Sequence, residues 1–141
     1  MIKAIKNTDL FCDYYENWIK VYKEGAVREI TLQKYKMTLS WIRKIVPSLQ
    51  LNNMNRIVYQ QILNEYALYH ERQTTMDFHH QLKGAILDAV DEGLIERDPT
   101  RKAIIKGINP KAKKIKYLNQ FNFTNLFSLI LIQININLIL I

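Results

Sequence analysis

Apolar side chains recur every three or four residues along four stretches of the chain, which is the spacing of an amphipathic helix. The clearest stretch follows Thr31 and stops at Pro47. Its apolar positions are Leu32, Tyr35, Leu39, Ile42 and Val46. Threonine is a good N-cap, and proline cannot continue a helix because it lacks the amide hydrogen. The pattern therefore predicts a helix that begins at Thr31 and ends before Pro47.

Three more helices are predicted by the same spacing. The first begins at Thr8 and ends near Gly25, and another covers residues 55–69. The last begins at the Thr74-Thr75 pair and ends at Gly93, because glycine commonly follows the end of a helix. The inward positions of the three are Phe11, Tyr14, Trp18 and Val21; Val58, Ile62, Tyr66 and Tyr69; and Phe78, Leu82, Ala85, Ile86 and Ala89. Four helices with short loops predict a small all-α bundle.

The segment after the last helix carries turn signals. Leu94 and Ile95 are expected to fold back on the final helical turn. Asp98-Pro99 predicts a turn, and residues 102–106 form a short β-like run. We therefore expect the folded domain to extend over residues 1–106.

Charge divides the 141 residues into three parts, although the whole chain carries a net charge of +7. Residues 1–100 hold 13 basic and 13 acidic side chains, and residues 101–117 hold seven basic and no acidic ones. Residues 118–141 hold no charged side chain. The change predicts a basic linker over 107–120 and an apolar tail over 121–141.

Basic side chains also gather on two of the predicted helices, on faces away from the apolar stripes. The second helix carries Lys34, Lys36, Ser40, Arg43 and Lys44, and the fourth carries Thr75, His79 and Lys83 at intervals of four residues. A solvated surface is the simplest interpretation of any one of them. Together with the linker, they match the cationic footprint of a phosphate-binding surface.

Patterns typical of catalytic and metal sites are largely absent from the sequence. The histidines are His70, His79 and His80, and no acid or cysteine lies at metal-ligand spacing from them. There is no phosphate-cradling glycine loop and no GxSxG or HExxH motif. The single cysteine, Cys12, is expected to be a half-buried structural thiol. We expect no cofactor, no metal and no small-molecule substrate.

Several short motifs follow one another in a distinctive order. They are Phe11 with Tyr14-Tyr15 and Trp18; Thr31 with Tyr35; Thr74-Thr75; Ala85 to Ala89; and Gly93-Leu94-Ile95 followed by Asp98-Pro99. In this order they resemble the SAM-like core-binding domain of phage integrases, which are tyrosine recombinases. The resemblance covers about residues 8–106 and continues to Tyr117-Leu118. It implies a small four-helix bundle that binds DNA.

The resemblance implies that the chain clamps double-stranded DNA during site-specific recombination and integration. Two helices and the linker would lie against the DNA. The contacts implied are Thr31, Lys34, Lys36, Arg43 and Lys44; Thr75, His79 and Lys83; and Lys102, Lys106, Lys113 and Lys114. A cytoplasmic location, in a bacterium or encoded by a phage or mobile element, is also implied. Other recombinase protomers are candidate partners.

The motifs of the recombinase catalytic domain cannot be placed in this sequence: its arginine, its lysine, its His-x-x-Arg pair and its tyrosine nucleophile. We therefore expect a truncated recombinase that binds DNA without cleaving it, and so no enzyme in itself. An alternative stays open, namely a recombinase-derived helical regulator or adaptor that binds an intact recombinase or competes with it.

The tail from residue 118 to 141 contains 15 Leu, Ile and Phe residues among Asn, Gln, Thr and Ser. Codons for Ile, Asn, Leu and Phe can consist of A and T alone, so a frameshift in AT-rich DNA is the favoured interpretation. A membrane anchor and a strand that pairs with a partner are the alternatives. Gln133, Asn135 and Asn137 alternate with isoleucines, which favours a strand and counts against a membrane span.

Overall fold

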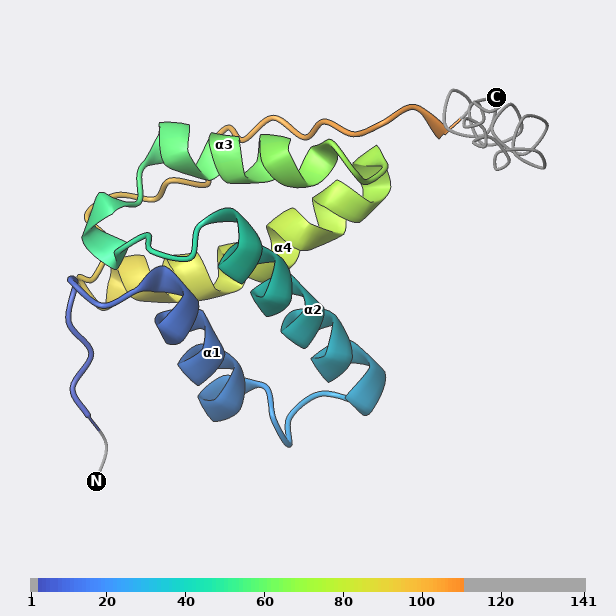
Figure 1. Ribbon diagram of the computed structural model, residues 1–141. Helices are drawn as coiled ribbons and strands as arrows, with labels where there is room; N and C mark the ends of the chain where they lie inside the picture. Colours follow the sequence, from blue (N-terminus) through green and yellow to red (C-terminus); the bar gives the residue numbers. More distant parts are fainter. Residues whose placement is uncertain (1–2, 111–141) are drawn as a thin grey trace, which may run out of the picture. The chain divides into compact units, whose positions relative to one another are not determined.

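The computed structural model describes residues 3–110 (Figure 1). Its elements are α1 (Phe11–Tyr22), α2 (Glu29–Ile45), the short 3-10 helix η1 (Leu51–Asn53), α3 (Arg56–Ala67) and α4 (Arg72–Asp91). No strand occurs in this range, so the predicted all-α class is confirmed. Residues 1–107 form one compact unit. The predicted tail and most of the predicted linker, including Lys113 and Lys114, lie outside the described residues.

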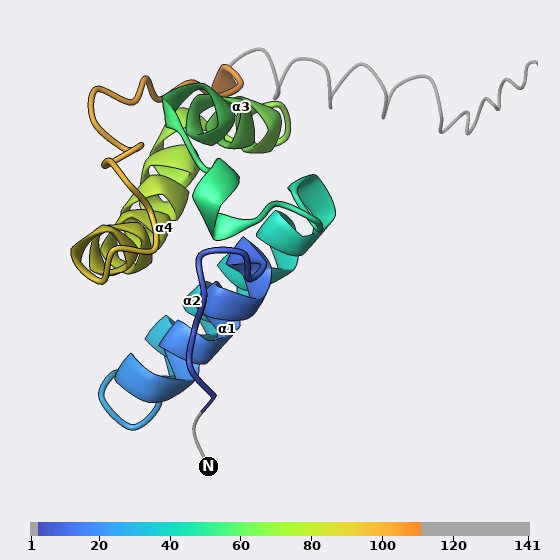
Figure 2. The ribbon, with the colours of Figure 1, turned by 90° about the vertical axis from the view of Figure 1, so that its left-hand side faces the viewer.

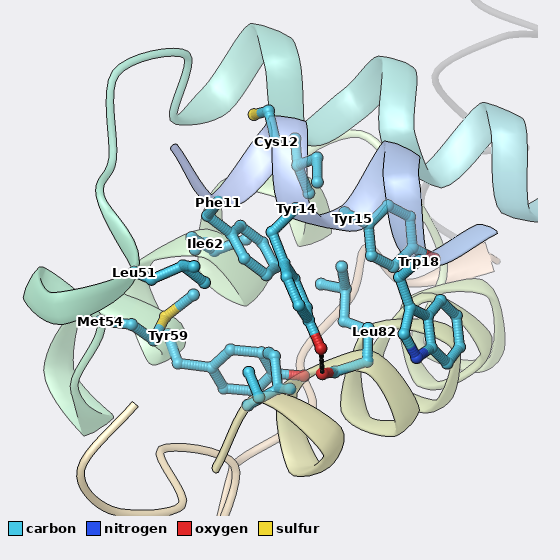
Figure 3. Close-up of a cluster of buried hydrophobic side chains, with 14 of the residues drawn as sticks. Phe11, Cys12, Tyr14, Tyr15, Trp18, Leu51, Met54, Tyr59, Ile62 and Leu82 are labelled. Carbon is cyan, nitrogen blue, oxygen red and sulfur yellow. Dashed lines mark hydrogen bonds between the residues drawn. The ribbon is translucent and has the colours of Figure 1, made fainter. Parts of the chain in front are cut away.

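The helices pack as two pairs, with α1 alongside α2 and α3 alongside α4 (Figures 1 and 2). Between the pairs, the aromatic side chains of α1 reach the backbone of α4. The Tyr15 hydroxyl donates to the carbonyl of Gln81 at 3.2 Å, and the Tyr14 hydroxyl donates to that of Ala85 at 3.1 Å (Figure 3). These bonds let two tyrosines lie in an apolar core with their polar atoms satisfied.

Two of the predicted helix starts are wrong in α1 and α2. The first helix starts at Phe11 rather than at Thr8, and its amide donates to the carbonyl of Leu49 at 2.8 Å. The loop after α2 therefore satisfies this helix end, so no side-chain cap is needed. The second helix starts at Glu29, which places Thr31 in its first turn instead of at the cap.

The start of α3 agrees with the prediction, and the start of α4 does not. The side chain of Asn55 accepts a hydrogen bond from the amide of Val58 at 2.9 Å, so the predicted start of α3 is confirmed. The fourth helix instead begins at Arg72, before the Thr74-Thr75 pair. The Thr75 hydroxyl donates to the carbonyl of Glu71 at 3.1 Å, which is a bond within the helix rather than a cap.

Most of the predicted inward positions are buried, others such as Tyr35 and Leu39 are half-buried, and the two exposed ones lie at helix ends. Every predicted inward residue of α4 is buried. Val21 and Tyr69 are each 61% exposed, because one is the penultimate residue of α1 and the other lies beyond α3. The periodicity alone missed Tyr15 and Tyr59, which are both fully buried.

The chain after α4 returns along α3 without forming a strand (Figure 1). Gly93 ends the helix as predicted, with a φ of +77° and with Ile95 buried behind it. The predicted β-like run at 102–106 is wrong. The side-chain amide of Gln60 donates to the carbonyl of Ile104 at 2.8 Å and accepts from the backbone amide of Ile104 at 2.9 Å. These two hydrogen bonds take the place of the backbone bonds that a neighbouring strand would make.

Candidate nucleic-acid interface

Helix α2 carries five of the twelve predicted contacts. Leu32, Thr38 and Ile42 are its buried residues, and Tyr35, Leu39 and Trp41 pack half-buried against the same core, so the exposed surface is formed by the polar positions of the other face. Lys34 and Lys36 are exposed, and neither forms a salt bridge within residues 3–110. The structure thus presents two ammonium groups on α2 without acidic partners.

Arg43, also predicted as a contact, is already engaged by α1. Its guanidinium lies 2.7 Å from the carboxylate of Glu16 and 3.6 Å from that of Asp13. Among the described residues it is the one cation in a salt bridge. Arg43 therefore joins α2 to α1, and its guanidinium is less available to an anionic ligand than the ammonium groups of Lys34 and Lys36.

Two lysines lie over aromatic rings, one in the last turn of α2 and the other at the end of α1. The ammonium group of Lys44 is 4.8 Å from the ring centroid of Trp41. That of Lys23 is 4.9 Å from the centroid of Trp18 and 5.4 Å from that of Tyr35. A ring face holds the stem of a lysine in place and leaves its full positive charge, so these contacts position cations rather than neutralise them.

On α4 the sequence interpretation needs a correction. Thr75 is fully buried and His79 is 8% exposed, so neither lies on an exposed cationic face. Of the three predicted residues on this helix, Lys83 alone reaches solvent, and it is half-buried. The four-residue spacing placed Thr75 and His79 next to the apolar stripe, and the packed face of α4 is wide enough to include them.

His79 is a buried partner of Tyr59. Its Nδ1 lies 2.7 Å from the Tyr59 hydroxyl. Burial lowers the pKa of His79, and the positive charges of His80 and Lys83 lower it further, whereas Asp98 acts in the opposite direction. The imidazole is therefore held in its neutral form, which makes it a structural group rather than a phosphate ligand.

Cys12 is also structural. It is 1% exposed, deeper than the half-buried position expected, and its thiol donates to the carbonyl of Val46 at 3.5 Å. Burial raises its pKa to about 11, so the reactive thiolate is disfavoured. Within residues 3–110 no group of three His, Cys, Asp or Glu side chains is placed to hold a metal ion. The same range contains no helix long and apolar enough to cross a membrane.

The segment after α4, which leads to the predicted linker, holds Lys102 and Lys106 exposed to solvent. They flank a stretch that Gln60 fastens to α3. At its end, Gly107 lies so close to the start of α4 that a Cβ atom there would be 2.6 Å from the Cα of Arg72. These contacts fix the course of the segment between its two lysines.

Sequence reasoning missed two arginines that the fold brings together. Arg56 begins α3 and Arg97 follows α4, and both line a groove of about 680 Å³ together with Arg101 and Lys102. Each lies in a part of the sequence with balanced charge, so no local signal marks it. Only the packing of residues 96–102 beside the start of α3 reveals the cluster.

Two solved structures resemble this chain. One is the crystal structure of the N-terminal domain of the prophage pi2 protein 01, an integrase from Lactococcus lactis, with 29% identity, a TM-score of 0.65 and coverage of 69% of this chain and 92% of that one. The other is the solution NMR structure of a phage integrase fragment from Staphylococcus saprophyticus, with 32% identity, a TM-score of 0.61 and coverage of 68% and 87%. The chain belongs to the phage integrase family. No protein-family model and no curated protein matches it.

The structure shows what several motif residues of this integrase domain contact. Trp18 and Tyr14 join α1 to α4, and Gly93 turns the chain after α4. In the Asp-Pro motif, the Asp98 carboxylate accepts from the amide of Thr100 at 2.8 Å and from its hydroxyl at 2.5 Å. Several of the motifs thus supply contacts or turns that hold the fold together, and the fold class drawn from the resemblance is confirmed.

Proposed function

We propose that this integrase domain holds double-stranded DNA by its phosphates, in the service of site-specific recombination and integration. The observation that carries the proposal is that Lys34 and Lys36 on α2 are exposed and have no acidic partner among the described residues, whereas Arg43 of the same helix pairs with Asp13 and Glu16 of α1. Membership of the integrase family supports it. Lys44 is a further exposed cation of α2 and Lys83 a half-buried one of α4, and Lys102 and Lys106 are exposed in the segment after α4.

Contacts between lysines and phosphates contribute to the affinity for DNA rather than to the recognition of a base sequence. Each lysine that neutralises a phosphate releases counterions from the DNA, so binding weakens as salt is added. Phosphate contacts fix the position and orientation of the protein on the duplex. The proposed role is therefore to hold and orient DNA.

We assign the described residues no part in strand cleavage. The hydroxyls of Tyr14 and Tyr15 donate to backbone carbonyls in the core. Burial raises the pKa of both tyrosines, and the same holds for Tyr59 and Tyr66. A buried, protonated phenol that is already hydrogen-bonded is a poor nucleophile, so these side chains serve the fold.

The proposal is tested by titrating a labelled duplex with the full chain at low salt. The double variant Lys34→Glu with Lys36→Glu should bind at least tenfold more weakly than wild type. The matched control is Lys3→Glu with Lys6→Glu, which changes the net charge equally at two exposed positions outside α2. Equal losses in the two variants, or no binding by the wild type, would overturn the proposal.

A further inference from the structure

A groove at one end of the bundle gathers cations from two distant parts of the chain. Its lining includes Arg56 at the start of α3, and Arg97, Arg101 and Lys102 from the turn after α4. All four side chains are exposed, and none of them forms a salt bridge within the described residues. The groove is therefore a concentrated site of unpaired positive charge, separate from the outer surface of α2.

The carboxylates in the same groove do not neutralise it. Asp98 is turned toward Thr100, whose amide and hydroxyl both donate to one of its oxygens. Glu96 is the other acid in the lining. Four cations and two carboxylates leave the lining with a net charge of +2.

The start of α3 lacks the anion that a helix N-terminus favours. Free amide groups make this end of a helix positive, and an acidic side chain in the first turn normally compensates for it. In α3 the first turn holds no acid, and its first residue is Arg56. Asn55 satisfies the amide of Val58, which leaves the amides of the preceding positions without a partner among the described residues. An anion in the groove would meet both these amides and the arginines.

We propose that this groove binds a phosphodiester of the DNA backbone, with Arg56, Arg97 and Arg101 as its ligands. The inference rests on the proposed function and adds a second contact region to it. Arginine is suited to this role because its planar guanidinium can donate two parallel hydrogen bonds to one phosphate. The groove is continuous with Lys102, where the lysine-flanked linker segment begins.

The test uses the full chain and a labelled duplex of random sequence, with affinity measured over a series of salt concentrations. Arg56→Gln, Arg97→Gln and Arg101→Gln together should weaken binding at least tenfold and reduce the slope of log K against log salt by about 1, since the loss of one phosphate contact removes about 0.9. The matched control is Arg72→Gln, an exposed arginine at the first position of α4, which should change affinity less than threefold.

The outcomes separate this inference from the proposed function. If the wild type binds DNA and the triple variant keeps both its affinity and its salt slope, the groove is not a DNA contact while the proposed function stands. If the wild type does not bind, both the inference and the proposed function fail.

In a second measurement, NMR signals of the arginine side chains are followed during titration with duplex and with inorganic phosphate. Shifts of the groove arginines with the duplex support the proposal. Shifts with inorganic phosphate alone overturn it.

Discussion

Trp18 donates from its indole nitrogen to the carboxylate of Asp88 at 2.7 Å, which joins α1 to α4 across 70 positions of sequence. The indole is 4% exposed, so its polar atom would otherwise be buried without a partner. The ring lies against α4 at Gly84, where a Cβ atom would be 3.5 Å from the indole, an ordinary contact distance.

Replacing the indole by a phenyl ring tests this contact. We expect Trp18→Phe to lower the free energy of unfolding by about 1 to 3 kcal/mol, because Asp88 then loses its donor and a space opens beside α4. Urea denaturation of the full chain followed by circular dichroism measures the change. Val21→Ala, at an exposed position on the same helix, should stay within about 0.5 kcal/mol of wild type.

The two glycines that contact other elements should respond in opposite directions to alanine. Gly107→Ala should destabilise the domain by about 1 to 3 kcal/mol, because the new Cβ would overlap the backbone of Arg72. Gly84→Ala should raise stability by up to about 1 kcal/mol, since its Cβ meets Trp18 at an ordinary distance and alanine favours a helix. Thermal unfolding of both variants checks the signs, and a stabilised Gly107→Ala would contradict the described path of the linker.

His79 makes stability depend on pH. Its pKa in the folded state lies below the ordinary 6.5, so below that pH the unfolded chain takes up the proton more readily than the folded one. The contribution of His79 is therefore complete above pH 6.5 and is lost as the pH falls through that value toward the folded pKa. We expect the urea midpoint to decrease between pH 7.5 and pH 5. His79→Gln should weaken this dependence most, whereas replacing the exposed His80 by glutamine should weaken it less, because burial is the larger cause of the lowered pKa of His79.

Cys12 should be protected in the folded protein. Its thiol is buried, and its pKa is raised to about 11, so little thiolate forms at neutral pH. We expect slow reaction with a thiol reagent in the native state and rapid reaction in urea. Rapid native labelling would show that α1 does not pack as described.

The two basic residues Lys36 and Arg43 should differ as DNA contacts. Lys36 has no acidic partner in the described region, whereas Arg43 is bound by Glu16 and Asp13. We expect Lys36→Ala to weaken duplex binding several-fold and to lower the salt slope by about 1. Arg43→Ala should change DNA affinity less, because the guanidinium of Arg43 is already engaged by two carboxylates of α1 and is less available to a phosphate. A larger effect for Arg43 would reverse this ranking.

The sequence predicts the helices well because burial follows a simple period. Leu82, Ile86 and Ala89 are apolar at the spacing of one helical face, and that face is packed. The helix starts were harder, because the amide of Phe11 is satisfied by the carbonyl of Leu49 from a distant loop rather than by a local threonine. Such tertiary contacts leave no local signal.

The candidate site shows the same limit. The sequence predicts that lysines such as Lys36 are exposed, because they lie away from the apolar stripe. It does not predict how wide the packed face of α4 is. His79 is therefore buried, although the sequence pattern predicts it on an exposed face. Arg56 and Arg97 line one groove only because the chain returns beside α3 after α4. Single-sequence patterns do not report that return.

The most direct test of the account is the affinity of the full wild-type chain for duplex DNA, measured over a range of salt concentrations. The account predicts measurable binding at low salt and a log K that falls linearly as log salt rises, with a slope that reflects several phosphate contacts. No binding at low salt, or an affinity that salt leaves unchanged, would contradict it.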